Sequence, residues 1–251
     1  EKFKSRDHTE NLLSKNLQAI KKNKKNIMVT GKKFLKPLDI SVPGDPSSAA
    51  FFVALTILNK NSSIRIKNVG LNPTRIGFYE LLKKYGANIK FQNLKKNNNE
   101  IYGDLFVKSC KIKPIKASKD FYVKSTDEYP IMFVIAALTP GVSVFNGIGD
   151  LANKESNRIK EMQNILKQIG VFSSFKNGKL LVKGKKFDSK VIKKVSVPNL
   201  GDHRICMSAA ILGLLTGIEV KIRNFETVRT SSPSFLKIVK QLGGSFEKKY
   251  T

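Results

Sequence analysis

The sequence predicts an α/β fold built from three repeated units, and three observations support this class. First, an apolar helix, a short turn, a strand and an amphipathic helix recur three times along residues 45–247. Second, 41, 43 and 41 residues separate the Asp that begins each unit from the Gly that ends its second helix. Third, 41% of the residues are apolar, which allows a packed core and excludes a disordered polar chain.

The first helix of each unit is apolar nearly all round, which is typical of a helix that is buried on every side. These helices are expected within residues 44–55, 127–138 and 202–212. If the three helices pack together, their starts lie on one side of the lobe. Each start carries an acidic residue, and any one of the three is typical of an N-cap: Asp45, Asp127 and Asp202.

Strands and amphipathic helices follow in the same order in each unit. The strands with alternating character are expected at 63–68, 142–146 and 218–224. The amphipathic helices, each closed by Gly, are expected at 75–85, 158–169 and 234–242. A further strand is expected after each Gly, at 88–92, 171–175 and 244–247.

Residues 1–40 do not fit the repeat, and we interpret them as the end of another, amino-terminal lobe. A helix is expected from the Ser5–Glu10 motif to about Lys15, and a basic turn follows it. Strands are expected near Ile27–Thr30 and Leu38–Val42. Because a motif is already under way at Ser5 and the first residue is not Met, we expect part of a longer protein, with one complete lobe over residues 41–251.

The net charge of +27 first suggests a nucleic-acid partner, because phosphate backbones attract dense positive charge. The charge comes from 39 Lys and only seven Arg, and the Lys are spread along the chain. A basic, nonenzymatic nucleic-acid-binding lobe needs basic residues clustered on one face and interleaved with aromatics. The scattered Lys make nucleic acid an unfavoured partner. Four Arg lie instead in short motifs: Arg6, Arg75, Arg158 and Arg204.

Two features bear on the compartment. No run approaches the roughly 18 consecutive apolar residues of a membrane span, so a membrane partner is not expected. Cys110 and Cys206 cannot form a disulfide framework and are interpreted as free thiols of a reducing compartment. We therefore expect a cytoplasmic protein.

Six short motifs occur in order along the chain, at residues 5–10, 42–51, 72–75, 127–130, 154–158 and 202–208. Together they resemble the 5-enolpyruvylshikimate-3-phosphate synthase family, and in particular its glyphosate-tolerant bacterial branch. The resemblance implies two lobes, each of three βαβαββ units. This chain then corresponds to one enolpyruvyl transferase-like lobe with buried helices and outer strands, preceded by the end of the other lobe.

The resemblance also implies a reaction. The family transfers the enolpyruvyl group of phosphoenolpyruvate to the 5-hydroxyl of shikimate 3-phosphate and releases phosphate, with no cofactor and no metal. The family motifs that bind shikimate 3-phosphate in the amino-terminal lobe are not in this sequence. We therefore expect this chain to carry the phosphoenolpyruvate half of the site, as a monomer that needs the amino-terminal lobe in cis or in trans.

The resemblance assigns roles to six residues. Asp127 matches the carboxylate at the 5-hydroxyl and Glu155 the one that moves protons at the methylene carbon, so both are candidate catalytic residues. Candidate substrate-binding residues are Lys154, Arg158, Arg204 and Arg6. A guanidinium fork suits carboxylate and phosphate groups. From the residues alone, the 154–158 segment is an ordinary charged helix start.

Two departures and one alternative remain. Asn157 stands where the family usually has Asp, so Arg158 is expected to be held less firmly. Arg229 lies one position before Thr230, where many members carry Lys. The alternative is the related UDP-N-acetylglucosamine enolpyruvyl transferase, which uses a loop Cys. Cys110 and Cys206 lie in a basic segment and an apolar helix, and both are expected to be inert.

Overall fold

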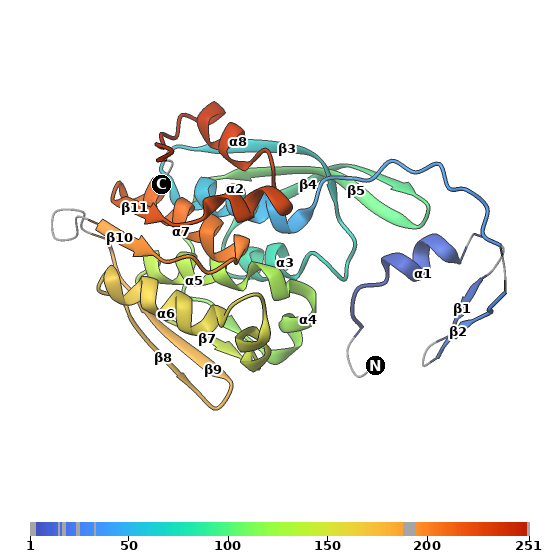
Figure 1. Ribbon diagram of the computed structural model, residues 1–251, viewed down its shortest axis with the longest axis horizontal. Helices are drawn as coiled ribbons and strands as arrows, with labels where there is room; N and C mark the ends of the chain where they lie inside the picture. Colours follow the sequence, from blue (N-terminus) through green and yellow to red (C-terminus); the bar gives the residue numbers. More distant parts are fainter. Residues whose placement is uncertain are drawn as a thin grey trace.

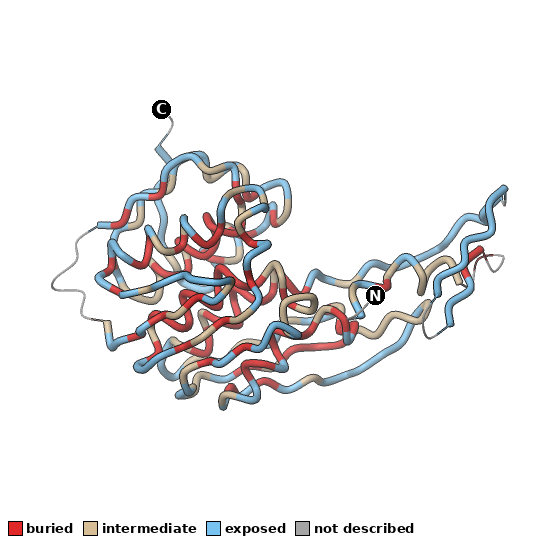
Figure 2. The backbone as a smooth tube through the Cα atoms, turned by 90° about the horizontal axis from the view of Figure 1, so that it is seen from below, coloured by how far each residue is buried: buried red, intermediate tan, exposed pale blue. Residues whose placement is uncertain are grey.

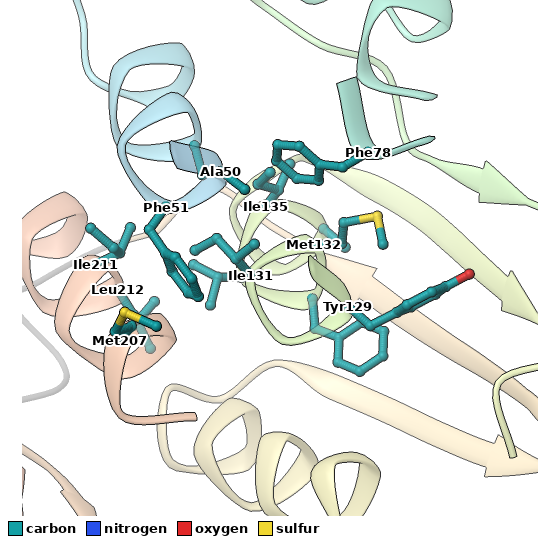
Figure 3. Close-up of a cluster of buried hydrophobic side chains, with 14 of the residues drawn as sticks. Ala50, Phe51, Phe78, Tyr129, Ile131, Met132, Ile135, Met207, Ile211 and Leu212 are labelled. Carbon is teal, nitrogen blue, oxygen red and sulfur yellow. The ribbon is translucent and has the colours of Figure 1, made fainter. Parts of the chain in front are cut away.

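Three apolar helices form the centre of the molecule, and each of them contacts the other two. The computed structural model describes residues 4–14, 16, 19–23, 26–32, 34–187 and 194–249. The central helices are α2 (Pro46–Leu58), α5 (Tyr129–Leu138) and α7 (His203–Thr216). Their side chains gather in one buried cluster that includes Phe51, Ile131 and Ile211 (Figure 3). The prediction of three buried helices packed together is confirmed.

Strands and amphipathic helices surround this centre (Figure 1). An antiparallel sheet of order β3-β5-β4 contains β3 (Ser63–Gly70), β4 (Asn88–Asn97) and β5 (Glu100–Lys108). A sheet of order β6-β7-β9-β8 contains β6 (Lys116–Ala117), β7 (Gly141–Asn146), β8 (Phe172–Lys176) and β9 (Lys179–Gly184). The parallel pair of the third unit is β10 (Lys194–Val197) and β11 (Glu219–Ile222). The amphipathic helices are α3 (Gly77–Lys84), α6 (Arg158–Gln168) and α8 (Phe235–Gln241).

Short helical segments connect these elements. They are η1 (Lys119–Phe121), α4 (Tyr122–Ser125), η2 (Thr126–Glu128), η3 (Gly149–Asn153) and η4 (Phe225–Thr230). The 3-10 helix η2 runs directly into α5, so its side chains lie at the end of the lobe where α5 begins. Within the described part of the chain, no helix has both the length and the apolar character needed to cross a membrane.

The third unit differs from the other two at its last strand. The amphipathic helices all end at a Gly with positive φ, as predicted: Gly86, Gly170 and Gly243. In the first two units the next strand then pairs with its successor in a hairpin, as β4 does with β5 and β8 with β9. The strand predicted at 244–247 is wrong, because among the described residues no neighbouring strand pairs with this segment.

The described residues between 4 and 43 form an arm at one side of the body in both overall views (Figures 1 and 2). The arm contains α1 (His8–Leu13) and the antiparallel pair β1 (Ile20–Lys22) and β2 (Ile27–Val29). The predicted strand at Leu38–Val42 is wrong: this stretch is exposed and pairs with no strand among the described residues. Its apolar pattern needs a neighbouring surface that the described chain does not supply.

Candidate active site

Asp127 is the centre of a cluster of three arginines. The carboxylate lies 2.5 Å from Nη2 of Arg6, 3.5 Å from Nη2 of Arg204 and 3.8 Å from Nη1 of Arg158. The N-cap interpretation is wrong for Asp127, because this residue lies inside η2 and Glu128 occupies the N-cap position of α5. The 3-10 turn directs the Asp127 carboxylate away from the helix N–H groups and toward the arginines.

The N-cap interpretation is confirmed for the other two aspartates. Asp45 accepts hydrogen bonds from the backbone N–H groups of Ser47 and Ser48 at the start of α2. Asp202 accepts from the N–H groups of Arg204 and Ile205 at the start of α7. These bonds satisfy N–H groups that have no partner inside the helix.

A buried ion pair joins α6 to α7. Nε of Arg158 donates to Asp202 at 2.9 Å, and both side chains are almost completely buried. Arg158 also pairs with Glu155, and the hydroxyl of Ser156 donates to Asp202 at 2.9 Å. Arg158 thus has two carboxylate partners, Asp202 and Glu155, in addition to Asp127.

The structure corrects one expectation about the 154–158 segment. The helix begins only at Arg158, so Lys154 and Glu155 lie in the preceding turn instead of in a helix start. Asn157 accepts a hydrogen bond from the N–H of Lys160 and caps α6. The burial of Arg158 and its bond to Asp202 hold the guanidinium. The expectation that Asn157 holds it less firmly than Asp stays a prediction.

Arg204 has unused hydrogen-bonding capacity. Its side chain is buried, yet Nε and Nη1 have no hydrogen-bond partner among the described residues. Buried polar groups are nearly always paired, so an unpaired guanidinium edge needs an explanation. A bidentate anion would supply both acceptors at once. Since both atoms are also shielded from solvent, such an anion reaches them only if the Arg204 side chain turns.

Lys154 lies at an open cavity of about 350 Å³ beside the cluster. The cavity is lined by Ser5, Arg6, Val123, Thr126, Asp127 and Lys154. The ammonium of Lys154 lies 2.7 Å from Asp150, which also accepts a hydrogen bond from the hydroxyl of Tyr122 at 2.6 Å. Five of the six predicted site residues therefore lie in the cluster or on this cavity, and the sixth, Glu155, pairs with Arg158 of the cluster. Arg229 instead pairs with Glu226 on η4.

The electrostatics of the cluster favour an ionised Asp127. Burial by itself raises the pKa of this carboxyl. The three guanidinium groups outweigh burial and hold the pKa below its ordinary value of 3.8. Asp202 and Glu155 already neutralise Arg158, so Arg6 and Arg204 share the single charge of Asp127. This arrangement leaves positive charge available to a further anion.

The buried carboxyl of Glu128 was not among the site residues predicted from the sequence. Its side chain accepts a hydrogen bond of 2.5 Å from the hydroxyl of Ser47, and Arg75 in turn donates to that hydroxyl at 2.8 Å. Burial raises the Glu128 pKa to about 7, and the Asp127 charge adds to this effect. Arg75 and Arg204 act in the opposite direction. In the sequence, only the position of Glu128 next to Asp127 indicated that it belongs to the site.

Replacing Glu128 with Gln should make stability less dependent on pH. Between about pH 4.5 and pH 7 the folded chain keeps the Glu128 proton while the unfolded chain loses it, so stability falls as pH rises. A shift from 4.5 to about 7 corresponds to about 3 kcal/mol. Urea unfolding at about pH 4.5 and about pH 8 measures this loss, which Glu128→Gln should abolish.

The difference between variant and wild type isolates Glu128 from other groups. This matters because His203 also contributes to the pH dependence of stability. Burial, with Arg204 contributing, lowers the pKa of His203, so its titration makes stability rise with pH and not fall. Glu80→Gln on the exposed side of α3 serves as the control and should keep the wild-type pH dependence. An unchanged pH dependence in Glu128→Gln would show that Glu128 is ionised in the folded chain.

Cys206 does not resemble a reactive loop thiol. Cys206 is buried in α7, and burial raises its pKa to about 12. Cys110 is half-buried, and its sulfur accepts a hydrogen bond from the N–H of Asn88. A thiol acts as a nucleophile only as the thiolate, so the inert role expected for Cys206 agrees with its environment. Nothing in this geometry favours the UDP-N-acetylglucosamine alternative.

The fold and the arginine cluster first define a class. The structure is similar to that of the enolpyruvyl transferase NikO from Streptomyces tendae, with a TM-score of 0.65 and 12% identity over 90% of this chain and 50% of that chain. At this identity the likeness shows the fold alone. The molecule thus has an enolpyruvyl transferase fold. The clustered guanidinium groups come from Arg6 before α1 and from Arg158 and Arg204 at the starts of α6 and α7.

Closer comparisons then give the family. The family model of EPSP synthase (3-phosphoshikimate 1-carboxyvinyltransferase) matches residues 3–239, and the chain belongs to this family. The structure of EPSP synthase from Acinetobacter baumannii is similar to it with a TM-score of 0.88 and 31% identity, over 100% of this chain and 57% of that chain. The expected family and fold class are confirmed.

Two curated relatives agree with this assignment. A 3-phosphoshikimate 1-carboxyvinyltransferase of Coxiella burnetii is 36% identical over 239 residues, which are 95% of this chain and 53% of the relative. One of Zymomonas mobilis is 38% identical over 249 residues, which are 97% and 55%. The chain spans about half the length of the curated relatives it matches.

Proposed function

We propose that this chain supplies the phosphoenolpyruvate half of an active site that makes 5-enolpyruvylshikimate 3-phosphate. The observation that carries the proposal is the convergence of Arg6, Arg158 and Arg204 on Asp127, together with the unpartnered edge of Arg204. A trianionic donor needs several cations, and a hydroxyl nucleophile needs a carboxylate close to them. The cluster holds both kinds of group within one set of ion pairs.

In the proposed reaction the 5-hydroxyl oxygen of shikimate 3-phosphate bonds to C2 of phosphoenolpyruvate while C3 gains a proton. The resulting tetrahedral intermediate then loses inorganic phosphate from C2 and a proton from C3, which leaves the enolpyruvyl ether. Arg204 binds the donor through its unused N–H groups. Arg158 is already bound by Asp202 and Glu155, so it contacts the donor only when Glu155 moves.

Asp127 and Glu155 divide the proton transfers in this proposal. Asp127 accepts the hydroxyl proton, and anions bound at Arg204 and at Arg6 offset the guanidinium charges that depress its pKa. The basicity of Asp127 therefore rises when the donor is bound at Arg204 and shikimate 3-phosphate at Arg6. Glu155 is half exposed and moves the proton at C3, with Arg158 as its neighbour.

Shikimate 3-phosphate belongs on the other side of Asp127 in this proposal. Arg6 and Lys154 line the cavity there and provide two cations for its phosphate and hydroxyl groups. Residues 1–40 are then the end of an amino-terminal lobe, and residues 41–251 are the complete lobe. The amino-terminal lobe, in cis or in trans, supplies the other contacts. Membership of the glyphosate-tolerant branch, a monomeric state and a cytoplasmic location stay predictions.

Replacing Arg204 with Ala should weaken phosphoenolpyruvate binding to this chain by about 10- to 150-fold. The range corresponds to the loss of a hydrogen bond to a charged group, about 1.5–3 kcal/mol. Isothermal titration calorimetry with phosphoenolpyruvate measures the dissociation constant directly. The exposed Arg223, which follows β11, gives the matched control Arg223→Ala, which should bind like the wild type.

Three results would contradict parts of the proposal. Equal affinities of Arg204→Ala and wild type would remove Arg204 from the donor site. Formation of 5-enolpyruvylshikimate 3-phosphate by the purified 251-residue chain alone would show that this lobe suffices, whereas we expect turnover only with an amino-terminal lobe added. If turnover is absent even with that lobe present, the proposed reaction is wrong.

A further inference from the structure

A buried polar joint connects the arm to the body, and it lies next to Arg6 in the sequence. The joint consists of Asp7 and Asn11 from the arm and of Asn72 and Glu100 from the body. The amide of Asn72 donates to Asp7 at 2.9 Å and to Glu100 at 3.1 Å. Figure 1 shows α1 beside the hairpin that β4 and β5 form.

Glu100 gathers further groups from the arm. It accepts a hydrogen bond of 2.8 Å from the amide of Asn11, and Nδ1 of His8 lies 3.0 Å from the same oxygen. Burial raises the pKa of Glu100, but the hydrogen bonds from Asn11, His8 and Asn72 outweigh it and the pKa is lowered. The joint therefore stabilises an ionised Glu100.

Asn72 has a fixed orientation. Its side-chain oxygen accepts from the backbone N–H of Thr74 at 2.8 Å and from the Thr74 hydroxyl at 2.7 Å. Both amide hydrogens are then directed at the carboxylates of Asp7 and Glu100. Asp7, Asn72 and Thr74 are all at least 95% buried. Removal of one partner from such a set leaves a buried polar group unpaired, which is costly.

The joint fixes the backbone directly beside Arg6. The side chain of Arg6 is nearly half exposed, and it reaches across the cavity to Asp127. Asp7 is the next residue, and its carboxylate also lies 2.8 Å from the ammonium of Lys4. The residue after Arg6 is thus anchored to the body, while the guanidinium itself projects toward the site.

We propose that Asn72 and Glu100 are positioning residues, which hold the first turn of α1 against the body so that Arg6 reaches Asp127. Asn72 and Glu100 lie in the loop after β3 and at the start of β5, and they act through Arg6. The consequence for substrate rests on the proposed function, because Arg6 serves there as a ligand of shikimate 3-phosphate. The positional role itself does not depend on that assignment.

A double-mutant cycle on the pKa of the Asp127 carboxyl tests this role without any substrate. NMR titration of a chain labelled with 13C at the aspartate carboxyls gives that pKa. Arg6→Ala should raise the pKa, because one of the cations that depress it is gone. Asn72→Ala and Glu100→Gln should raise it in the same direction, by no more than Arg6→Ala does.

The decisive comparison uses Arg6→Ala as the background. If Asn72 acts through Arg6, adding Asn72→Ala to Arg6→Ala does not shift the Asp127 pKa further, because the effects of coupled residues are not additive. The matched control is Asp104→Asn on the same strand as Glu100, where the carboxylate bonds to Arg65 and Asn93. It should leave the Asp127 pKa unchanged. If Asn72→Ala fails to fold, Glu100→Gln, which keeps the side-chain shape, decides the question.

Two outcomes overturn the proposal. One is an Asp127 pKa that equals the wild-type value in both Asn72→Ala and Glu100→Gln. The other is a shift of the Asp127 pKa by these substitutions that has the same size with and without Arg6. Titration of the same variants with shikimate 3-phosphate then separates the two inferences. If wild type does not bind this compound but the cycle shows coupling, the positioning role stands and the substrate assignment fails.

Discussion

Replacing Asp202 with Ala is expected to lower the free energy of unfolding by about 3–5 kcal/mol. The substitution removes the N-cap of α7, which by itself contributes about 0.5–2 kcal/mol. It also leaves the guanidinium of Arg158 buried without its 2.9 Å partner. The loss of this buried partner is the larger of the two effects, because the remaining partners of Arg158, Glu155 and Asp127, are both more exposed than Asp202. Urea denaturation followed by circular dichroism measures the change.

Asp45 provides the matched control, because it caps α2 in the same way at the same point of the repeat. Its side chain is 40% exposed, and its ion-pair partner Arg75 can reach water when the carboxylate is removed. Asp45→Ala should therefore lose only the cap, about 0.5–2 kcal/mol. Equal losses in the two variants would mean that the Arg158–Asp202 pair contributes nothing beyond capping.

Replacing Asp127 with Asn is expected to lower turnover by about 10²- to 10⁴-fold, the usual contribution of a general base. Affinity for phosphoenolpyruvate should not fall. The substitution removes a negative charge that faces Arg6, Arg158 and Arg204, and a trianion binds better when that charge is gone. The expected pattern is thus a loss in kcat without a rise in the KM for the donor.

Steady-state assays of phosphate release, with an amino-terminal lobe supplied, measure both constants. Arg204→Ala is the informative counterpart, because it should raise the KM for phosphoenolpyruvate. A variant Asp127→Asn that keeps wild-type kcat would remove Asp127 from proton transfer. A weaker donor affinity in that variant would instead show that Asp127 orders the arginines before the donor binds.

Much of the fold could be predicted because each unit carries its own local signals. Apolar residues on every side of α2 and α7 indicate burial, Asp45 and Asp202 indicate the helix starts, and Gly indicates where the amphipathic helices end. These signals depend on neighbouring residues only. The segments 38–42 and 244–247 were wrongly predicted, because a strand also needs a partner and a single segment does not reveal one.

The residues of the site could be predicted from the sequence, but their arrangement in space could not. The family motifs pointed to Asp127 and the arginines, but Asp127 also fitted the pattern of a helix cap. Its actual direction depends on the 3-10 turn before α5 and on arginines from distant parts of the chain. The buried Glu128 and the joint at Asn72 depend on contacts between residues 65 or more positions apart, which no local pattern reports.

The largely exposed segment 34–43 connects the arm that contains α1 to the body. The backbone of Lys36 bonds to the side chain of Asn16 in the arm, and beyond it the segment pairs with no strand among the described residues. The segment therefore links α1 to the body as a tether, and α1 is comparable to a ligand that is joined to its own receptor. Such a linkage gives an effective concentration on the order of millimolar. A joint of modest intrinsic affinity is then enough to keep α1 bound. A chain cut within this tether would make the same contacts concentration-dependent, and Arg6 would leave the site upon dilution.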